Sequence, residues 1–320
     1  MMKKLLLALF AAAVSCCGFA QDYPAKPLRL IVPFPAGSTP DIVGRTLGQK
    51  LSAAWHQPVV VDNKTGAAGN IGTAEAAHAR PDGYTLLIGI NGPIAVNQAL
   101  YKDLPYDPQK DLQPLSLLAS GPQLLAVHPS VPAKDLHELV AYARANPDKL
   151  SYGSVGAGSA SHLTMELLKS EAGIALVHVP YRGFPPLVQD LLAGNVQAAF
   201  AIVPAVLPQV KAGRLKALAV TSARRSALAP DIATVAEQGF AQFDATAWIG
   251  LLAPAPLPPA VAGRIAGEAQ RAMQLPEVRE LLGHQGFDVV GSSPDEFAAF
   301  IRRETEKWTA VVRKTGARAD

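Results

Sequence analysis

Cysteine is almost absent from this sequence of 320 residues, since it has only Cys16 and Cys17, both near the N-terminus. Once a segment ending at Ala20 is removed, the chain has no thiol, no disulfide and no cysteine ligand for a metal. The histidines beyond that point show no metal-ligand spacing. We therefore expect neither a metal ion nor another cofactor.

Long apolar runs are also missing, apart from one at the N-terminus. Met1–Lys4 is short and basic, Leu5–Val14 is unbroken apolar, and Gly18-Phe19-Ala20 places small residues where a signal peptidase reads them. The run is shorter than the roughly 20 residues that a spanning helix needs. Residues 1–20 are therefore predicted to be a signal peptide.

The exported protein is expected in the periplasm. A lipid anchor would need a lipoprotein signal around Cys16. The stretch AVSC is a poor one, because Ala13 stands where a larger aliphatic residue is usual. Lipid anchoring at Cys16 is therefore not expected.

An excess of one charge is absent as well. Removal of Lys3 and Lys4 leaves 27 basic against 26 acidic side chains. Nucleic-acid binding depends on clustered Lys and Arg, so a nucleic-acid partner is not expected. Roughly 300 mature residues exceed what one hydrophobic core usually serves, which predicts two lobes.

Short apolar runs alternate with amphipathic helical stretches along the whole chain, a pattern typical of an α/β fold with mainly parallel sheets. The predicted strands are Leu28–Val32, Pro58–Asp62, Thr85–Ile90, Gln123–Val127, Ser151–Gly153, Ala175–Pro180, Ala198–Ile202, Ala217–Thr221 and Trp248–Ala253. The predicted helices are Pro40–Ala54, Asn70–Ala79, Ala133–Asn146, Ser159–Ala172, Phe184–Ala193, Leu207–Ala212, Pro258–Met273, Pro276–His284 and Pro294–Thr315.

Two turns rich in glycine and hydroxyl groups each connect a predicted strand to a predicted helix. A helix N-terminus leaves backbone N–H groups unpaired and carries partial positive charge, so such turns can hold an anion. A third loop carries an aromatic residue and a cation. The predicted ligand-binding residues are Phe34, Ala36, Gly37, Ser38, Thr39 and Asp41 in the first turn, Ser154, Gly156, Ser159 and Ser161 in the second, Tyr181 and Arg182 in the third loop, and Asn91 and Pro204.

Each of these residues also has a purely structural interpretation. Thr39, followed by Pro40, and Ser159 have the pattern of helix N-caps. Asp41 would stabilise the dipole of the first helix turn. Loop arginines such as Arg182 are commonly only solvated, and Tyr181 could equally form the edge of a core.

The same turns argue against an enzyme. A hydrolase elbow needs Gly-x-Ser-x-Gly, which GSVGAGS does not supply, and the match to a dinucleotide fingerprint is weak. Ser161 and His162 are neighbours on a predicted helix, so their side chains point apart and cannot form a nucleophile–base pair. No catalytic residues are predicted.

The sequence resembles the Bug-type extracytoplasmic solute receptors, the substrate-binding subunits of tripartite tricarboxylate transporters. The resemblance covers nearly the whole mature chain. The stretches that carry it, in the order of the family, are RLIVPFPAGSTPDIVGR, VVVDNKTGAAGNIGTAEAAHARPDGYTLL, NQALYKDLPYDPQKDLQPLSLLA, YGSVGAGSASHL, HVPYRGFPPLVQDLLAGNVQAAF, AGRLKALAVTSARRS and WIGLLAP.

The resemblance implies a type II periplasmic-binding-protein fold, in which two α/β lobes close on a small ligand. Lobe 1 would comprise residues 21–123 and 248–320, and lobe 2 residues 124–247, with hinge strands near Gln123–Val127 and Trp248–Ala253. It also implies that the loops matching Phe34–Thr39 and Ser154–Ser161 meet the carboxylate of the ligand, partly through ordered water.

The chain departs from the family pattern in two places. Ser38 replaces the second of two consecutive glycines, which adds a hydroxyl donor. Ala201 stands where the family often has an aspartate after the residue matching Phe200, which removes a polar group from the second lobe. The second departure leaves the identity of the ligand open.

Together, the residues and the resemblance favour a periplasmic receptor that captures a small organic carboxylate and delivers it to integral membrane transporter subunits. The protein is expected to be a monomer and not an enzyme. The alternative is a periplasmic sensor that reports ligand occupancy to a signalling partner without transport. The two share the same site, so the sequence does not separate them.

Overall fold

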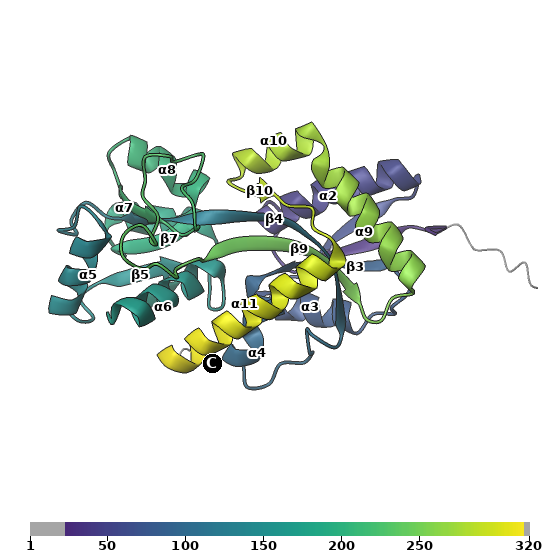
Figure 1. Cartoon of the computed structure of the whole chain (residues 1–320), viewed down its shortest axis with the longest axis horizontal. Helices are drawn as coiled ribbons and strands as arrows, with labels where there is room; N and C mark the ends of the chain where they lie inside the picture. Colours follow the sequence, from purple (N-terminus) through teal and green to yellow (C-terminus); the bar gives the residue numbers. More distant parts are fainter. Residues whose placement is uncertain (1–22, 317–320) are drawn as a thin grey trace, which may run out of the picture.

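The computed structural model describes residues 23–316, so the predicted signal peptide lies outside the described residues. Figure 1 shows an elongated molecule with two lobes, in which helices cover both faces of a long twisted sheet. The predicted α/β architecture with two lobes is confirmed. No helix within residues 23–316 combines the length and apolar composition needed to cross a membrane.

Most expected elements are present, and several begin or end at other residues than predicted. The strands are β1 (Leu28–Val32), β2 (Val59–Asn63), β3 (Thr85–Ile90), β4 (Leu112–Val127), β5 (Ser151–Ser154), β6 (Val177–Pro180), β7 (Ala198–Ile202), β8 (Lys216–Val220), β9 (Thr246–Pro254) and β10 (Asp288–Val289). The helices are α2 (Thr39–Trp55), η1 (Ala67–Gly69), α3 (Asn70–Ala77), η2 (Gly92–Val96), α4 (Asn97–Leu100), α5 (Leu136–Ala145), α6 (Ala160–Ala172), α7 (Phe184–Ala193), α8 (Val203–Lys211), α9 (Pro259–Gln274), α10 (Pro276–His284) and α11 (Pro294–Thr315).

The sheet follows the order β2-β1-β3-β9-β4-β7-β5-β6, with β8 and β10 paired to β4 outside this path. The first lobe holds β1, β2 and β3, which are parallel, and the second holds β5, β6 and β7, also parallel. In each lobe the turns after parallel strands therefore gather at one edge, where ligands bind in open α/β sheets.

Two antiparallel strands, β4 and β9, join the lobes. They pair from Leu112 opposite Pro254 to Pro122 opposite Thr246, after which β4 continues into the second lobe and pairs with β7 and β8. The lobe boundaries predicted from the sequence fall within or next to these strands. Any movement of one lobe relative to the other must therefore bend these two strands.

The apolar core is divided on one face of the sheet and continuous on the other. One cluster, with Leu47 and Ile265, lies between β1, α2 and α9 of the first lobe, and another, with Leu187 and Val206, lies under α7 and α8 of the second. A third cluster, which we call the shared core, contains residues of both lobes and of α11, including Trp308. In Figure 1, α11 lies along this face between the lobes.

A buried carboxylate, Glu304 of α11, holds this arrangement together. Its Oε2 accepts hydrogen bonds from the indole N–H groups of Trp248 (3.2 Å) and Trp308 (2.9 Å) and from the amide of Asn91 (3.5 Å). Asn91 in turn donates to the carbonyl of Thr246 and accepts from the backbone N–H of Trp248. Asn91, a predicted ligand-binding residue, is thus fully engaged where β3 meets the strand β9.

We predict that Glu304→Leu lowers the free energy of unfolding by about 1–3 kcal/mol for each buried donor that it leaves without a partner. Urea denaturation measures this loss. Glu306→Leu is the matched control, since Glu306 is an exposed residue of the same helix and its replacement should change stability by no more than about 0.5 kcal/mol. Equal losses in the two variants would contradict the role assigned to Glu304.

Candidate ligand-binding site

The first turn connects β1 to the 17-residue helix α2. Ser38, rather than Thr39, takes the N-cap position, and its hydroxyl makes no capping hydrogen bond. The expectation that Thr39 is the cap is therefore wrong, because the helix begins one residue earlier. The Ser38 hydroxyl oxygen is buried and has no hydrogen-bond partner in the protein.

Asp41 fixes the shape of this turn through hydrogen bonds. Its carboxylate accepts hydrogen bonds from the backbone N–H of Gly37 (2.8 Å), from Arg45 (2.9 Å) and from the amide of Asn63 (2.8 Å). Burial opposes ionisation, but these donors outweigh it and leave the pKa of the Asp41 carboxyl below its ordinary value. The structure thus places Asp41 as a support of the turn, with Asn63 as a partner that the sequence did not suggest.

A neighbouring loop packs against Phe34, which is half-buried at the start of the first turn. In this loop Ala67 and Ala68 have the positive φ values of 44° and 52°, which side chains other than glycine rarely adopt. A Cβ on Gly69 would lie 2.9 Å from the Phe34 ring and 3.0 Å from Pro93. Strained backbone of this kind is common at ligand sites. We therefore include this loop in the candidate site, together with the turn after β1 and the turn after β5.

In the second turn the hydroxyl groups bind the protein itself. Ser154 is fully buried, and its oxygen lies 2.6 Å from His178 Nε2 and accepts the N–H of Gly156 at 3.1 Å. Ser159 caps α6 by accepting the N–H of His162 (3.4 Å), as predicted, and donates to the Gly156 carbonyl at 2.6 Å. Ser161 accepts the N–H of Val155 at 3.0 Å. These contacts make the turn rigid.

Two histidines, His162 and His178, support this turn, and sequence reasoning gave His178 no role. His162 Nδ1 accepts the N–H of Gly158 at 3.2 Å, and the ring centroids of His162 and His178 are 4.3 Å apart. Burial, and next the neighbouring His178, lower the pKa of His162 to about 4. Burial also lowers the pKa of His178. Both rings are therefore neutral at pH 7.

The structure also places five further predicted residues, Tyr181, Arg182, Ala36, Gly37 and Pro204. The hydroxyl of Tyr181 donates to Asp190 at 2.7 Å, and Arg182 is exposed. Ala36 and Gly37 are exposed as well. Pro204, at the start of α8, packs against Gly286, where a Cβ would lie 2.5 Å from Pro204 Cδ.

The two turns are connected through contacts between the lobes. Phe34 touches Gly69, which touches Pro93, and a Cβ on the adjacent Gly92 would lie 2.7 Å from the carbonyl oxygen of Gly158 in the second turn. The predicted residues Phe34 and Gly156 thus belong to turns that meet the same segment, η2. This continuity favours one site between the lobes.

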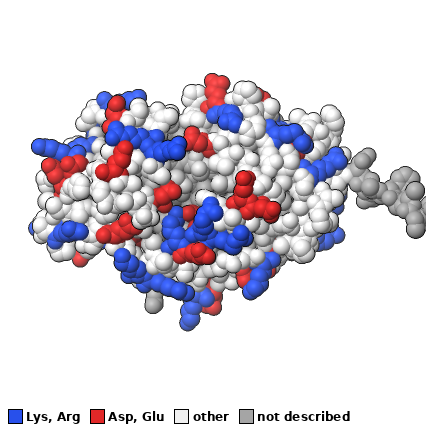
Figure 2. Space-filling model, in the orientation of Figure 1, with Lys and Arg blue, Asp and Glu red and all other residues white. Residues whose placement is uncertain are grey.

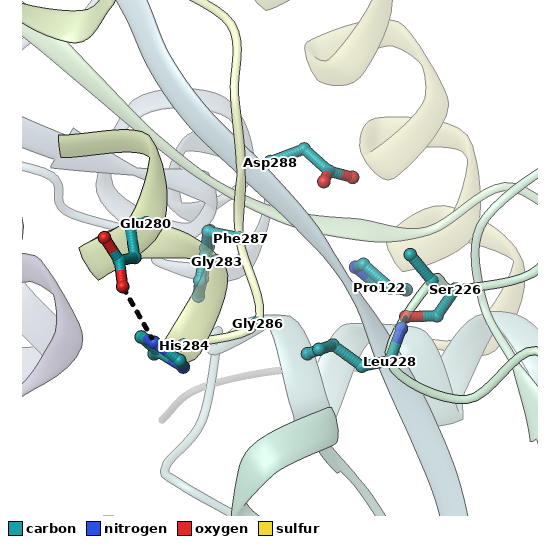
Figure 3. Close-up of a pocket in the computed structure, with 10 residues that line it drawn as sticks. Pro122, Ser226, Leu228, Glu280, Gly283, His284, Gly286, Phe287 and Asp288 are labelled. Carbon is teal, nitrogen blue, oxygen red and sulfur yellow. Dashed lines mark hydrogen bonds and ion pairs between the residues drawn. The ribbon is translucent and has the colours of Figure 1, made fainter. Parts of the chain in front are cut away.

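A separate cavity of about 280 Å³ lies between α10 and the loop after β8. Figure 3 shows Leu228 and Ser226 facing Gly286 and His284, with Pro122 of β4 nearby. None of the predicted ligand-binding residues lines this cavity, although Pro204 contacts Gly286 at its border.

The charged side chains show no face of a single sign in the view of Figure 2, where blue and red groups are interspersed over both lobes. Many of them form ion pairs, such as Lys50 with Glu277 at 2.8 Å and Arg225 with Glu237 at 3.0 Å. An anionic ligand would therefore be recognised by local donors rather than by the overall field of the protein.

We predict that the protein loses stability as the pH falls from about 6.5 towards 4. The unfolded chain binds a proton at His162 near pH 6.5 and the folded chain only near pH 4, so the unfolded state is favoured across this window. The loss should reach on the order of 3 kcal/mol. Thermal melts between pH 4 and 7 measure it.

The matched variant is His162→Asn, which keeps an acceptor for the Gly158 N–H and cannot titrate. It should reduce the loss of stability at low pH and leave the part due to His178, whereas His284→Asn, at an exposed position of α10, should keep the parental slope. A parental slope in the His162 variant would refute this assignment.

The chain is similar to known proteins in both sequence and structure. Residues 43–317 match the model of the tripartite tricarboxylate transporter family receptor, TctC. The chain is 37% identical to the protein BugT of Bordetella pertussis over 98% of both chains. It is similar in structure to a protein of R. palustris solved with adipate (32% identity, TM-score 0.83, 92% of this chain and 99% of the other).

It is also similar to MatC of Rhodopseudomonas palustris with bound malate (31% identity, TM-score 0.81, 91% of this chain and 100% of the other). Adipate and malate are both small dicarboxylates. The family match and these relatives each cover most of the chain. The chain therefore belongs to the TctC family of solute-binding receptors, to which the Bug proteins also belong.

Proposed function

We propose that this protein is a periplasmic receptor that binds a small organic dicarboxylate between its lobes and delivers it to a tripartite tricarboxylate-type membrane transporter. The observation that carries the proposal is the Ser38 hydroxyl, which is buried at the N-terminus of α2 without a partner in the protein. A hydroxyl without a partner is costly when buried, and a bound carboxylate would supply the missing acceptor.

The position of Ser38 suits an anion. The N-terminus of a 17-residue helix carries partial positive charge, and Asp41 already holds the N–H of Gly37, so the turn keeps its shape without a ligand. Preorganised donors lose little entropy on binding. The relatives solved with adipate and malate support a dicarboxylate as the ligand class.

The remaining parts of the proposal follow from family and sequence. Delivery to a membrane transporter is the role for which the family is named. Export to the periplasm follows from the signal-like residues 1–20. The receptor has no reaction to perform, so affinity and the change in shape on binding are its functional quantities.

We expect dicarboxylates to raise the melting temperature of the purified protein. A ligand that binds only the folded state stabilises it by about 2.7 kcal/mol at a hundredfold excess over its Kd. A thermal-shift panel of malonate, succinate, malate, adipate, acidic amino acids and neutral sugars tests this. The proposal fails if sugars raise the midpoint and no carboxylate does.

Ser38 and Ser159 should respond in opposite ways to replacement by alanine. Ser38→Ala should weaken dicarboxylate binding ten- to hundredfold, because a hydrogen bond to a charged group contributes about 1.5–3 kcal/mol. The unfolding free energy of the ligand-free protein should stay the same or rise, because the buried Ser38 hydroxyl has no partner in the protein. Ser159→Ala should remove a helix cap and lower that free energy by about 0.5–2 kcal/mol.

Calorimetric titration and urea denaturation of both variants measure these effects. Ser226→Ala, in the loop after β8, is the control for loss of a hydroxyl elsewhere. If Ser38→Ala binds like the parent, the carboxylate is held by other donors. The unpaired Ser38 hydroxyl then no longer supports the proposed function.

A further inference from the structure

Two glycines, one from each lobe, meet at a close backbone contact between the lobes. Gly92 begins η2 in the first lobe, and Gly158 lies in the turn between β5 and α6 in the second. A Cβ on Gly92 would lie 2.7 Å from the Gly158 carbonyl oxygen and 3.5 Å from its carbonyl carbon. Real Cβ atoms essentially never approach backbone so closely, so any side chain at position 92 would push the lobes apart.

The glycine at position 92 is explained by this contact alone. Gly158 has φ of +75°, so its own backbone conformation already favours glycine. Gly92 is not among the glycines with positive φ, and its backbone conformation would suit other residues. Its requirement for glycine is therefore set by the opposite lobe.

The partner segment is unable to move aside on its own. The Gly158 N–H is held by His162 Nδ1 at 3.2 Å, and the next residue, Ser159, is bound to Gly156 at 2.6 Å. On the other side, Gly92 directly follows Asn91, which is tied to β9 and to Glu304. Relief of a clash would therefore require movement of one whole lobe relative to the other.

Asn97 of the first lobe places an unpaired oxygen beside this contact. Its amide nitrogen donates to Asn70 Oδ1 at 2.5 Å, which turns its oxygen towards Gly158. A Cβ on Gly158 would lie 2.8 Å from that oxygen, which is buried without a hydrogen-bond partner. When the lobes separate, water can reach the oxygen, so hydration favours the open state until a ligand offsets it.

We propose that Gly92 and Gly158 form a closure seat, the stop against which the two lobes come to rest, and that this seat sets the width of the closed ligand site. Both are positioning residues, since they act through the lobes and not on the ligand. The inference rests on the proposed function, because a fixed width selects dicarboxylates by length. A side chain at the seat widens the closed site.

The test is Gly92→Ala, which adds one Cβ without backbone strain. Titration calorimetry with succinate, malate and adipate should show at least tenfold weaker binding of the two shorter acids, with a smaller loss for adipate. Gly263→Ala is the matched control, because a Cβ there, in α9 of the same lobe, meets nothing within 4 Å. It should bind all three acids like the parent.

Distances between two spin labels measure closure itself. The labels are attached at Arg80→Cys and Lys149→Cys, two exposed positions in opposite lobes. The protein is expressed from Gln21, so it has no other cysteine. The parent should show a short distance that saturating dicarboxylate enriches. In Gly92→Ala this distance should be longer or missing, while circular dichroism and the melting temperature of the free protein stay near the parental values.

Parental affinities together with a parental short distance in Gly92→Ala would overturn the closure seat. If the parent binds none of the acids, the proposed function fails, and the seat is then judged from the ligand-free distances alone. A short-distance population present in the parent and absent from Gly92→Ala supports it, and identical distributions overturn it. A Gly92 variant that no longer folds also overturns it, because the contact would then be needed for folding and not for closure.

Discussion

The burial of one carboxylate, that of Glu304, is the constraint on which the rest of the structure depends. A carboxyl group in the interior needs hydrogen-bond donors around it, and here they come from the residue after β3, from β9 and from α11 itself. Because β9 also joins the lobes, the same set of bonds positions the strands about which the lobes would move. The segment η2, which starts beside Asn91, is thereby held in place next to the two turns of the candidate site.

The two turns of the site use their polar groups differently. In the second turn, serines and histidines satisfy one another and the backbone, which makes the turn rigid. In the first turn, buried Asp41 makes the supporting hydrogen bonds. The hydroxyl of Ser38 is buried there without a hydrogen-bond partner in the protein. A rigid surface with one unsatisfied group is a plain physical basis for recognising a small anion.

Sequence reasoning predicted the elements whose pattern is local. The apolar runs Leu28–Val32 and Ala198–Ile202 are strands with the expected bounds, and the cap at Ser159 is present. The first eleven residues of β4, 112–122, were missed, because Pro114 and Pro122 argue against a strand. The sheet accommodates this part through irregular register between Pro114 and Ser116 and between Leu117 and Ala119.

Features that depend on contacts distant in sequence could not be predicted. The pairing of β5 with β6 brings His178 to Ser154, and no local pattern indicates that pairing. The closed contact of Gly92 with Gly158 and the burial of Glu304 are likewise tertiary. The N-cap position falls on Ser38 and not on Thr39, because the start of a helix shifts by one residue more easily than its existence changes.

The shared core has a consequence for folding. Trp308 and its neighbours belong to an apolar cluster that includes residues of both lobes. The first lobe is complete only when β9 and α11, which follow the second lobe in the sequence, pack against it. Neither lobe thus has a complete interior of its own. The molecule is a two-lobed body but a single cooperative unit, so a segment cut at the lobe boundary would expose apolar surface instead of yielding an independent domain.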